Sequence, residues 1–393
     1  MTKTSARRRV YLDYSATTPV APEVVQAMQP YLTDLFGNAA SLHEFGREAA
    51  AALDEAHIVT GCALGARASE IVFTGCGTEA DNLALRGAAF AARQHGRGDH
   101  IISAPTEHHA VTSTLEQLQQ LFGFEVTFLP VDGCGRVDPD DVKRALRRNT
   151  ILVSIMMANN EIGTLEPIAE IGHMCRERGV IFHTDAVQCP AYLPIDVEAL
   201  QVDLMALSSH KFYGPKGVGI LYIREGTPFV PTLTGGGHER GRRAGTVNVA
   251  GAVGTAVALE YVAQQRETQA PRLQRLRDRL IEGVLAAVPD ARVSGHPHNR
   301  LPHHASFVFK GVDGETLLMA LDVEGIAVST GSACTSGNPE PSPVLLAMGI
   351  PSEWALGGLR ISLGYHTSDE DLDYVLEKLP RCVAQVRRAM SEL

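Results

Sequence analysis

A glycine-rich turn, an aspartate and a lysine stand at positions of this 393-residue chain where they could act together on one ligand. The turn GCGTEAD (75–81) follows a short apolar run and opens a helical pattern, so backbone N–H groups and the helix dipole could bind a phosphate. Asp185 and Lys211 each end a further apolar run. A lysine amine forms a Schiff base with an aldehyde, and a carboxylate keeps a pyridinium nitrogen protonated so that the ring withdraws electrons. The combination indicates pyridoxal phosphate (PLP).

The glycine-rich turn by itself does not select PLP. The sequence GCGTEA also fits the Gly-x-Gly-x-x-Ala form of a dinucleotide fingerprint, with Glu107 as the partner of the ribose, and a plain structural turn fits it as well. Hydride transfer has no evident use for Asp185 or Lys211. These two residues therefore favour PLP over a nicotinamide dinucleotide.

Other polar side chains at predicted strand ends fit the same ligand. His108 could stack on the PLP ring and exchange protons, because imidazole titrates near neutral pH, although a purely structural histidine is the commoner case. Asn160 and Gln188 could hydrogen-bond the phenolic oxygen of the ring, while Ser208 and His210 flank the lysine as a phosphate pocket would require. Ligands of open α/β sheets bind at the carboxyl ends of the strands, which is where these residues fall.

A single cysteine, Cys334, stands among small and polar residues in the stretch STGSACTSGN (329–338). Most free cysteines lie in cores as small hydrophobes, but nothing bulky in this loop could shield a thiol. The chain has seven cysteines, an odd number, and no C-x-x-C pair. This pattern fits reduced, separate thiols better than a disulfide framework or a zinc ribbon. Cys334 is the thiol whose setting suggests a reaction.

The elements that must position these residues alternate between strand and helix from about residue 70 to 225. Near-continuous apolar strands joined by helical crossovers predict a mostly parallel sheet covered on both faces, and the stretch KGVGILYI (216–223) could add an antiparallel strand. After residue 250 a long helical pattern is expected to break at Pro271 and then resume. Shorter mixed elements follow, which predicts a smaller α+β domain from about residue 264.

Composition and charge exclude several classes of function. The formal net charge of −10 argues against a general nucleic-acid binder. No apolar segment follows the basic first residues and no apolar run is long enough to span a membrane, so we expect a cytoplasmic protein without a membrane partner. The histidine-rich stretch 295–304 could suggest a metal site, but a solvated loop is favoured, and no intrinsic metal is expected.

Eight stretches, in order along the chain, resemble those of the cysteine desulfurases, and most closely the NifS/IscS-like branch of the fold-type I, class V aminotransferase PLP enzymes. They are FTGCGTEADN, TEHHAV, NNEIG, HTDAVQ, SSHKFYGPKGVG, GGGHERGRRAGT, STGSACTSGNPEPS and RISLG. The resemblance extends from VYLDYSATTPV (10–20) to the C-terminus. It implies a seven-stranded, mostly parallel sheet in a large PLP-binding domain (19–263). It also implies a small domain (1–18 with 264–393) that carries a catalytic cysteine loop at about 329–343.

The resemblance also implies roles for individual residues. Lys211 is the lysine that binds the PLP aldehyde, Asp185 pairs with the pyridinium nitrogen, and Arg360 clamps the substrate carboxylate, with Asn160 also at the substrate. Thr246 is expected to reach the phosphate of a partner subunit's cofactor, which implies a homodimer with shared active sites. The full set expected around PLP is Gly77, Thr78, His108, Asn160, Asp185, Gln188, Ser208, His210, Lys211 and Thr246.

By the same resemblance, Cys334 is the nucleophile, and Lys211 and His108 complete the catalytic set. The enzyme converts L-cysteine to L-alanine, leaves the sulfur on Cys334 as a persulfide, and passes it to an iron–sulfur scaffold or a thiolation factor. Cys334 is also expected to ligate an iron–sulfur cluster transiently with the scaffold. A selenocysteine or cysteine C–S lyase of the same fold is the alternative, and a non-catalytic sulfur carrier would leave the PLP residues unexplained. Cys76 and the pair Tyr365–His366 depart from the usual pattern of these relatives.

Overall fold

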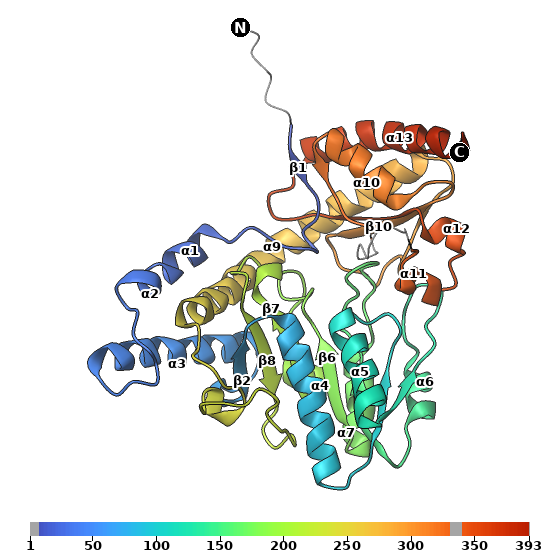
Figure 1. Cartoon of the computed structure of the whole chain (residues 1–393). Helices are drawn as coiled ribbons and strands as arrows, with labels where there is room; N and C mark the ends of the chain where they lie inside the picture. Colours follow the sequence, from blue (N-terminus) through green and yellow to red (C-terminus); the bar gives the residue numbers. More distant parts are fainter. Residues whose placement is uncertain (1–7, 331–339, 393) are drawn as a thin grey trace.

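The computed structural model describes residues 8–330 and 340–392 (Figure 1). Its largest sheet has seven strands in the order β2-β8-β7-β6-β5-β3-β4. β8 is antiparallel to both of its neighbours and every other pairing is parallel. This confirms the predicted fold class, including the antiparallel strand. The strands are β2 (Ile71–Thr74), β3 (His100–Ser103), β4 (Glu125–Phe128), β5 (Thr150–Ser154), β6 (Ile181–Asp185), β7 (Leu204–Ser208) and β8 (Gly219–Ile223).

Helices cover both faces of this sheet, which explains why the central strands are apolar along their whole length. Leu152 of β5 belongs to the core beneath α4 and α5, whereas its neighbour Val153 packs in the core that includes α7 and α9. Successive side chains of a strand point to opposite faces, so both faces need apolar residues. The helices of this part are α1 (Pro22–Met28), α2 (Pro30–Thr33), α3 (Glu44–Leu64), α4 (Gly77–Gln94), α5 (His109–Phe122), α6 (Pro139–Ala145), α7 (Ile168–Arg178), α8 (Val197–Leu200) and α9 (Val249–Ala287).

The register of the central strands brings the polar strand ends together. β6 and β7 are parallel neighbours, with Asp185 opposite Ala206, and Lys211 follows three residues after the end of β7 in the short 3-10 helix Ser209–Lys211. α4 begins at Gly77, directly after β2. The chemistry-bearing turns therefore lie along one edge of the sheet.

A second, smaller assembly of strands and helices lies above that edge in Figure 1. It contains an antiparallel three-stranded sheet in the order β12-β10-β9 and a parallel pair, β1 and β11. The predicted division into domains 19–263 and 1–18 with 264–393 remains a prediction, and α9 runs through the proposed boundary. The elements are β1 (Val10–Tyr11), β9 (Ala291–Val293), β10 (His304–Phe309), β11 (Ile326–Ala327), β12 (Gly358–Ser362), α10 (Gly314–Val323), α11 (Pro343–Ala347), α12 (Ser352–Ala355) and α13 (Asp369–Ser391).

The expected break at Pro271 is wrong, because α9 continues through it as one 39-residue helix. A proline inside a helix loses one backbone hydrogen bond and crowds the preceding turn. Here buried side chains on both sides hold the helix in place, with Leu259 and Val262 before the proline and Leu273 and Leu276 after it. Tertiary packing thus outweighs the local preference.

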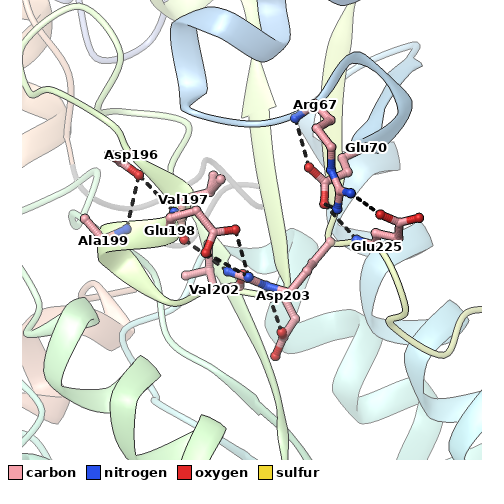
Figure 2. Close-up of polar contacts among 10 residues, drawn as sticks. Arg67, Glu70, Asp196, Val197, Glu198, Ala199, Val202, Asp203 and Glu225 are labelled. Carbon is pink, nitrogen blue, oxygen red and sulfur yellow. Dashed lines mark hydrogen bonds and ion pairs between the residues drawn. The ribbon is translucent and has the colours of Figure 1, made fainter.

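Ion pairs and hydrogen bonds cluster at the other end of the strands of the large sheet, opposite the polar strand ends described above (Figure 2). Glu70, which precedes β2, accepts hydrogen bonds from the Arg67 guanidinium (3.0 Å) and from the backbone N–H of Glu225 (2.8 Å). Arg224 donates to the Glu198 carboxylate and to the carbonyl of Val202. These charged groups pair with one another, so their clustering is explained by the structure alone.

No helix within residues 8–330 and 340–392 is long and apolar enough to cross a membrane.

The second half of the histidine-rich stretch is not the solvated loop that was expected. His303 and His304 are buried, and His304 begins β10. The His303 ring stacks on Tyr192 with 3.6 Å between the ring centroids. Burial lowers the pKa of both imidazoles well below the usual value. The two rings are therefore neutral core residues.

Candidate active site

A cavity of about 290 Å³ lies at the carboxyl ends of the central strands. Ten of the residues predicted from the sequence line it, and they come from both parts of the chain: Gly77, Thr78, His108, Asn160, Asp185, Gln188, Ser208, His210, Lys211 and Arg360. The other lining residues are Ser15, Ala16, Cys76, Asp81, Met156 and Val187. Thr246 is exposed and does not line this cavity, and Cys334 lies outside the described residues.

The first turn of α4 forms one wall of the cavity and has the geometry of an anion site. A Cβ atom at Gly77 would lie 3.1 Å from the side chains of Ser208 and Val187, so any larger residue would have to displace these neighbours slightly. Cys76 precedes the helix, and its Sγ accepts the N–H of Glu79 at 3.4 Å. A thiol can thus serve as the N-cap here, where an oxygen-bearing side chain is usual.

Glu79, in the first turn of α4, does not line the cavity, and an arginine neutralises its negative charge. Its carboxylate accepts the N–H of Gly75 at 2.7 Å and pairs with the Arg243 guanidinium, also at 2.7 Å. Gly77 and Thr78 of the first turn line the cavity together with Ser208. The backbone N–H groups and hydroxyls of these residues are donors of the kind that bind the phosphate of PLP.

Asp185 provides a buried carboxylate at the end of β6. One of its oxygens accepts the N–H of Val187 at 2.9 Å. The pKa of Asp185 is raised to about 7, mainly by burial and in part by the nearby Asp81, while His108 acts in the opposite direction. Within the described residues, Asp185 has no ion-pair partner at salt-bridge distance. A protonated pyridine nitrogen would stabilise the ionised form, so this residue also fits PLP.

Lys211 points its amine into the cavity from the turn after β7. The Nζ atom donates to the backbone carbonyls of Ser15 (2.6 Å) and Ala16 (2.8 Å). Burial lowers the pKa of Lys211 to about 8, and the nearby Arg360 guanidinium lowers it as well. Near physiological pH the neutral amine, which an attack on an aldehyde requires, is therefore far more abundant than for an ordinary lysine.

His108 is the N-cap of α5 and lines the cavity. Its Nδ1 accepts the N–H of Ala110 at 3.0 Å, which assigns any ring proton of the neutral form to Nε2. Surrounding protein atoms lower the pKa of His108, Asp185 opposes that effect, and Lys211 adds to it. The imidazole is thus a neutral group that can accept a proton.

Arg360 brings a cation into the cavity from the antiparallel sheet above. It lies on β12, is 7% exposed, and donates from Nη1 to the Asn160 carbonyl at 2.9 Å. Its Nη2 forms an ion pair with Asp13 at 2.9 Å. Gln188 lines the same cavity, and its amide donates to the Ser15 carbonyl at 3.0 Å.

Sequence reasoning missed the contribution of residues 13–18. This segment makes four of the contacts just described: one to Arg360, two to Lys211 and one to Gln188. Three of the four use backbone carbonyls, which residue types do not reveal. The stretch VYLDYSATTPV (10–20) contributes to the prediction only as the start of the resemblance, and the carboxylate of Asp13 is the one signal in it that could have suggested a role.

A second cavity, of about 460 Å³, adjoins the first and shares His108, Asn160 and Arg360 with it. Ser329 and Thr330, the last described residues before position 331, line this second cavity.

Tyr365, one of the residues that depart from the usual pattern of the relatives, stacks on Tyr213 with ring centroids 4.4 Å apart and donates to the Ala191 carbonyl. Tyr365 therefore contributes to packing and lines neither of the two cavities.

The chain is similar to known proteins along nearly its whole length. Residues 10–375 match the aminotransferase class-V family. The chain is 50% identical to "Cysteine desulfurase IscS" of Dictyoglomus turgidum over 381 residues, which cover 97% of this chain and 96% of that protein. It is 48% identical to the protein of the same name from Clostridium botulinum over 388 residues, covering 98% and 97% of the two chains.

Two solved structures show the same architecture. One, titled "NIFS-LIKE PROTEIN", has a TM-score of 0.90 and 37% identity, and the match covers 96% of this chain and all of that one. The other, titled "SspA in complex with cysteine", has a TM-score of 0.79 and 34% identity, with coverage of 90% and 98%.

Proposed function

Because the chain belongs to the class V aminotransferase family and is a PLP-dependent cysteine desulfurase, we propose that the cavity at the strand ends is its active site and that Cys334 receives the sulfur. The observation that carries the proposal is the convergence of Lys211, Asp185 and Arg360 on one cavity from three separate elements. An amine, a buried carboxylate and a guanidinium in one space match the aldehyde, the ring nitrogen and the substrate carboxylate.

The cofactor would be held along its whole length by residues of this cavity. The first turn of α4, with Gly77 and Thr78, and the side chains of Ser208 and His210 would bind its phosphate, and Asp185 would hold the ring nitrogen. His108, Asn160 and Gln188 are assigned to the ring and its phenolic oxygen. When bound, PLP supplies the electron sink that weakens the bonds at the substrate α-carbon.

The protein's own groups then move the protons. Lys211, with a pKa of about 8, can accept the proton from the substrate α-carbon and return it. His108 is assigned to the proton at the substrate sulfur, because its imidazole is neutral and the residue lines the cavity. Arg360 orients the substrate through its α-carboxylate, since a guanidinium can bind both carboxylate oxygens.

Sulfur transfer is assigned to Cys334. Its thiolate forms a bond to the substrate sulfur, the bond from that sulfur to the β-carbon breaks, and the electron pair remains on the β-carbon. Protonation of that carbon gives alanine, and Cys334 carries the persulfide. Support comes from Ser329 and Thr330, which lead toward the segment that contains Cys334 and line the cavity that adjoins the active site.

The partners are proposed on different grounds. Large apolar side chains lie exposed on α2 and around the start of α3, namely Leu32, Phe36, Leu42 and Phe45, and they support a homodimer in which Thr246 serves the partner's site. An iron–sulfur scaffold or a thiolation factor is the proposed acceptor of the persulfide. The six described cysteines are unpaired, which is consistent with a reducing compartment such as the cytoplasm.

Reduction of the purified protein with borohydride tests the cofactor assignment. A pyridoxyl group should be found on Lys211 by peptide mapping, and Lys211→Ala should abolish both the adduct and the yellow colour. Lys216→Ala is the matched control, because this exposed lysine is close in sequence and does not line the cavity. An adduct on another lysine in the wild-type protein would contradict the assignment.

A further inference from the structure

Residues 13–18, of sequence DYSATT, connect the two cations of the active site. Asp13 holds the Arg360 guanidinium at 2.9 Å, while the carbonyls of Ser15 and Ala16 accept from Lys211 at 2.6 and 2.8 Å. The segment then continues to His210, whose Nδ1 lies 3.0 Å from the Thr17 hydroxyl. With the Ser15 carbonyl that also accepts from the Gln188 amide, the segment contacts four groups that are assigned to catalysis or binding.

The backbone of this segment is fixed against the strand that carries Arg360. The N–H of Ser362 on β12 donates to the Leu12 carbonyl at 2.8 Å, and the Ser362 hydroxyl accepts the N–H of Ser15 at the same distance. The Tyr11 hydroxyl donates to the carbonyl of Asp13 at 3.0 Å. Asp13 is thus held in register with Arg360 by bonds on both sides of it.

Two contacts define the plane of the Arg360 guanidinium. Nη1 donates to the Asn160 carbonyl and Nη2 to one oxygen of Asp13, both at 2.9 Å. Each of these nitrogens carries two hydrogens, so one N–H on each is left for a ligand. Among the described residues, Asp13 is the one carboxylate within ion-pair distance of Arg360. The neighbouring His304 is buried and neutral and supplies no charge.

We propose that Asp13 is a positioning residue for substrate recognition, which holds the Arg360 guanidinium in the orientation that receives the substrate α-carboxylate. The inference rests on the role of Arg360 in the proposed function. Asp13 uses a single oxygen on a single nitrogen of the guanidinium, and the substrate can bind without displacing it. A long arginine side chain without this contact would adopt several orientations, and part of the binding free energy would be lost in ordering it.

Equilibrium binding of L-alanine, the product, tests this without turnover. Titration of the holoenzyme is followed by the absorbance change of the bound cofactor, for the wild type, Asp13→Asn and Asp13→Ala. Asn keeps the shape of the side chain and one acceptor oxygen, so it separates charge from packing. L-Alaninamide, which lacks the carboxylate charge, is the matched ligand, and Asp54→Asn is the matched variant because Asp54 is exposed on α3.

We expect Kd for L-alanine to rise roughly 10-fold in Asp13→Ala and less in Asp13→Asn, because one charge-assisted contact is lost. Kd for L-alaninamide and the cofactor content should not change. With L-cysteine, KM should rise while kcat stays within about 2-fold of the wild type, since an orienting contact acts on binding.

Two results would overturn the inference. An unchanged Kd for L-alanine in both variants would show that Arg360 needs no help from Asp13, and a lower Kd would show that Asp13 competes with the substrate. Arg360→Ala in the same titration separates the role proposed for Arg360 from the role proposed for Asp13. If that variant also binds L-alanine normally, the proposed role of Arg360 fails; if it binds weakly while the Asp13 variants bind normally, only the role of Asp13 fails.

Discussion

The pH dependence of cofactor attachment gives a quantitative test of the environment of Lys211. Only the neutral amine attacks the PLP aldehyde, and burial lowers the pKa of Lys211 to about 8. From that value, the neutral fraction is ~10% at pH 7 and ~90% at pH 9. A lysine of ordinary pKa would be neutral to only ~0.03% at pH 7 and ~3% at pH 9.

The assay is recombination of apoenzyme with PLP, followed by absorbance in the Schiff-base region over a series of pH values. N-α-acetyl-lysine in the same buffers serves as the reference, because it corrects for the titration of PLP itself. The rate for the enzyme divided by the rate for the reference should fall about 10-fold between pH 7 and pH 9, as the neutral fraction of Lys211 saturates first.

Lys211→Arg provides the blank for this measurement, because it keeps a cation and cannot form the adduct. A rate ratio that stays constant from pH 7 to pH 9 would mean that Lys211 titrates like a free lysine. The argument from burial and from the nearby Arg360 would then be wrong.

Three further outcomes are expected. Asp185→Asn should weaken PLP binding roughly 10- to 100-fold, because a charged hydrogen bond becomes a neutral one, and unchanged retention of PLP on dialysis would contradict this. Leu42→Asp should shift the protein toward monomers in sedimentation, whereas Leu121→Asp, at another exposed apolar position, on α5, should not; identical behaviour of the two would remove the support for the apolar interface. Pro271→Ala should raise the free energy of unfolding by about 1–3 kcal/mol because it restores a helix hydrogen bond, and a lower stability would show that the ring contributes to packing.

The sequence predicted the parts of the site that depend on strand ends. Parallel strands end at the same edge of a sheet, so Asp185 and Lys211 could be placed side by side once their apolar runs were recognised. The glycine-rich turn could be assigned only together with them. The arrangement of the seven-stranded sheet followed from the alternation of strand and helix and from the resemblance to the desulfurases.

Other features depend on contacts that one sequence does not reveal. The Ser15 carbonyl binds Lys211 across 196 positions of the chain, and a backbone group has no residue-type signature. His303 was expected in a solvated loop as part of the histidine-rich stretch 295–304, but it is buried and stacks on Tyr192. Helix α9 passes through Pro271 because packing on both sides holds it, and that packing is a property of the folded chain.

The formation of alanine by Cys334→Ser tests the central claim most directly. A serine hydroxyl is nearly isosteric with the thiol but is a far weaker nucleophile toward sulfur. The variant should remain yellow and should still change its spectrum with L-cysteine, while alanine falls to near background and no added sulfur atom is found on the protein by mass spectrometry. Cys62→Ser, at an exposed position on α3, should turn over like the wild type. Alanine production by Cys334→Ser at close to the wild-type rate would contradict the account and would identify the enzyme as a lyase.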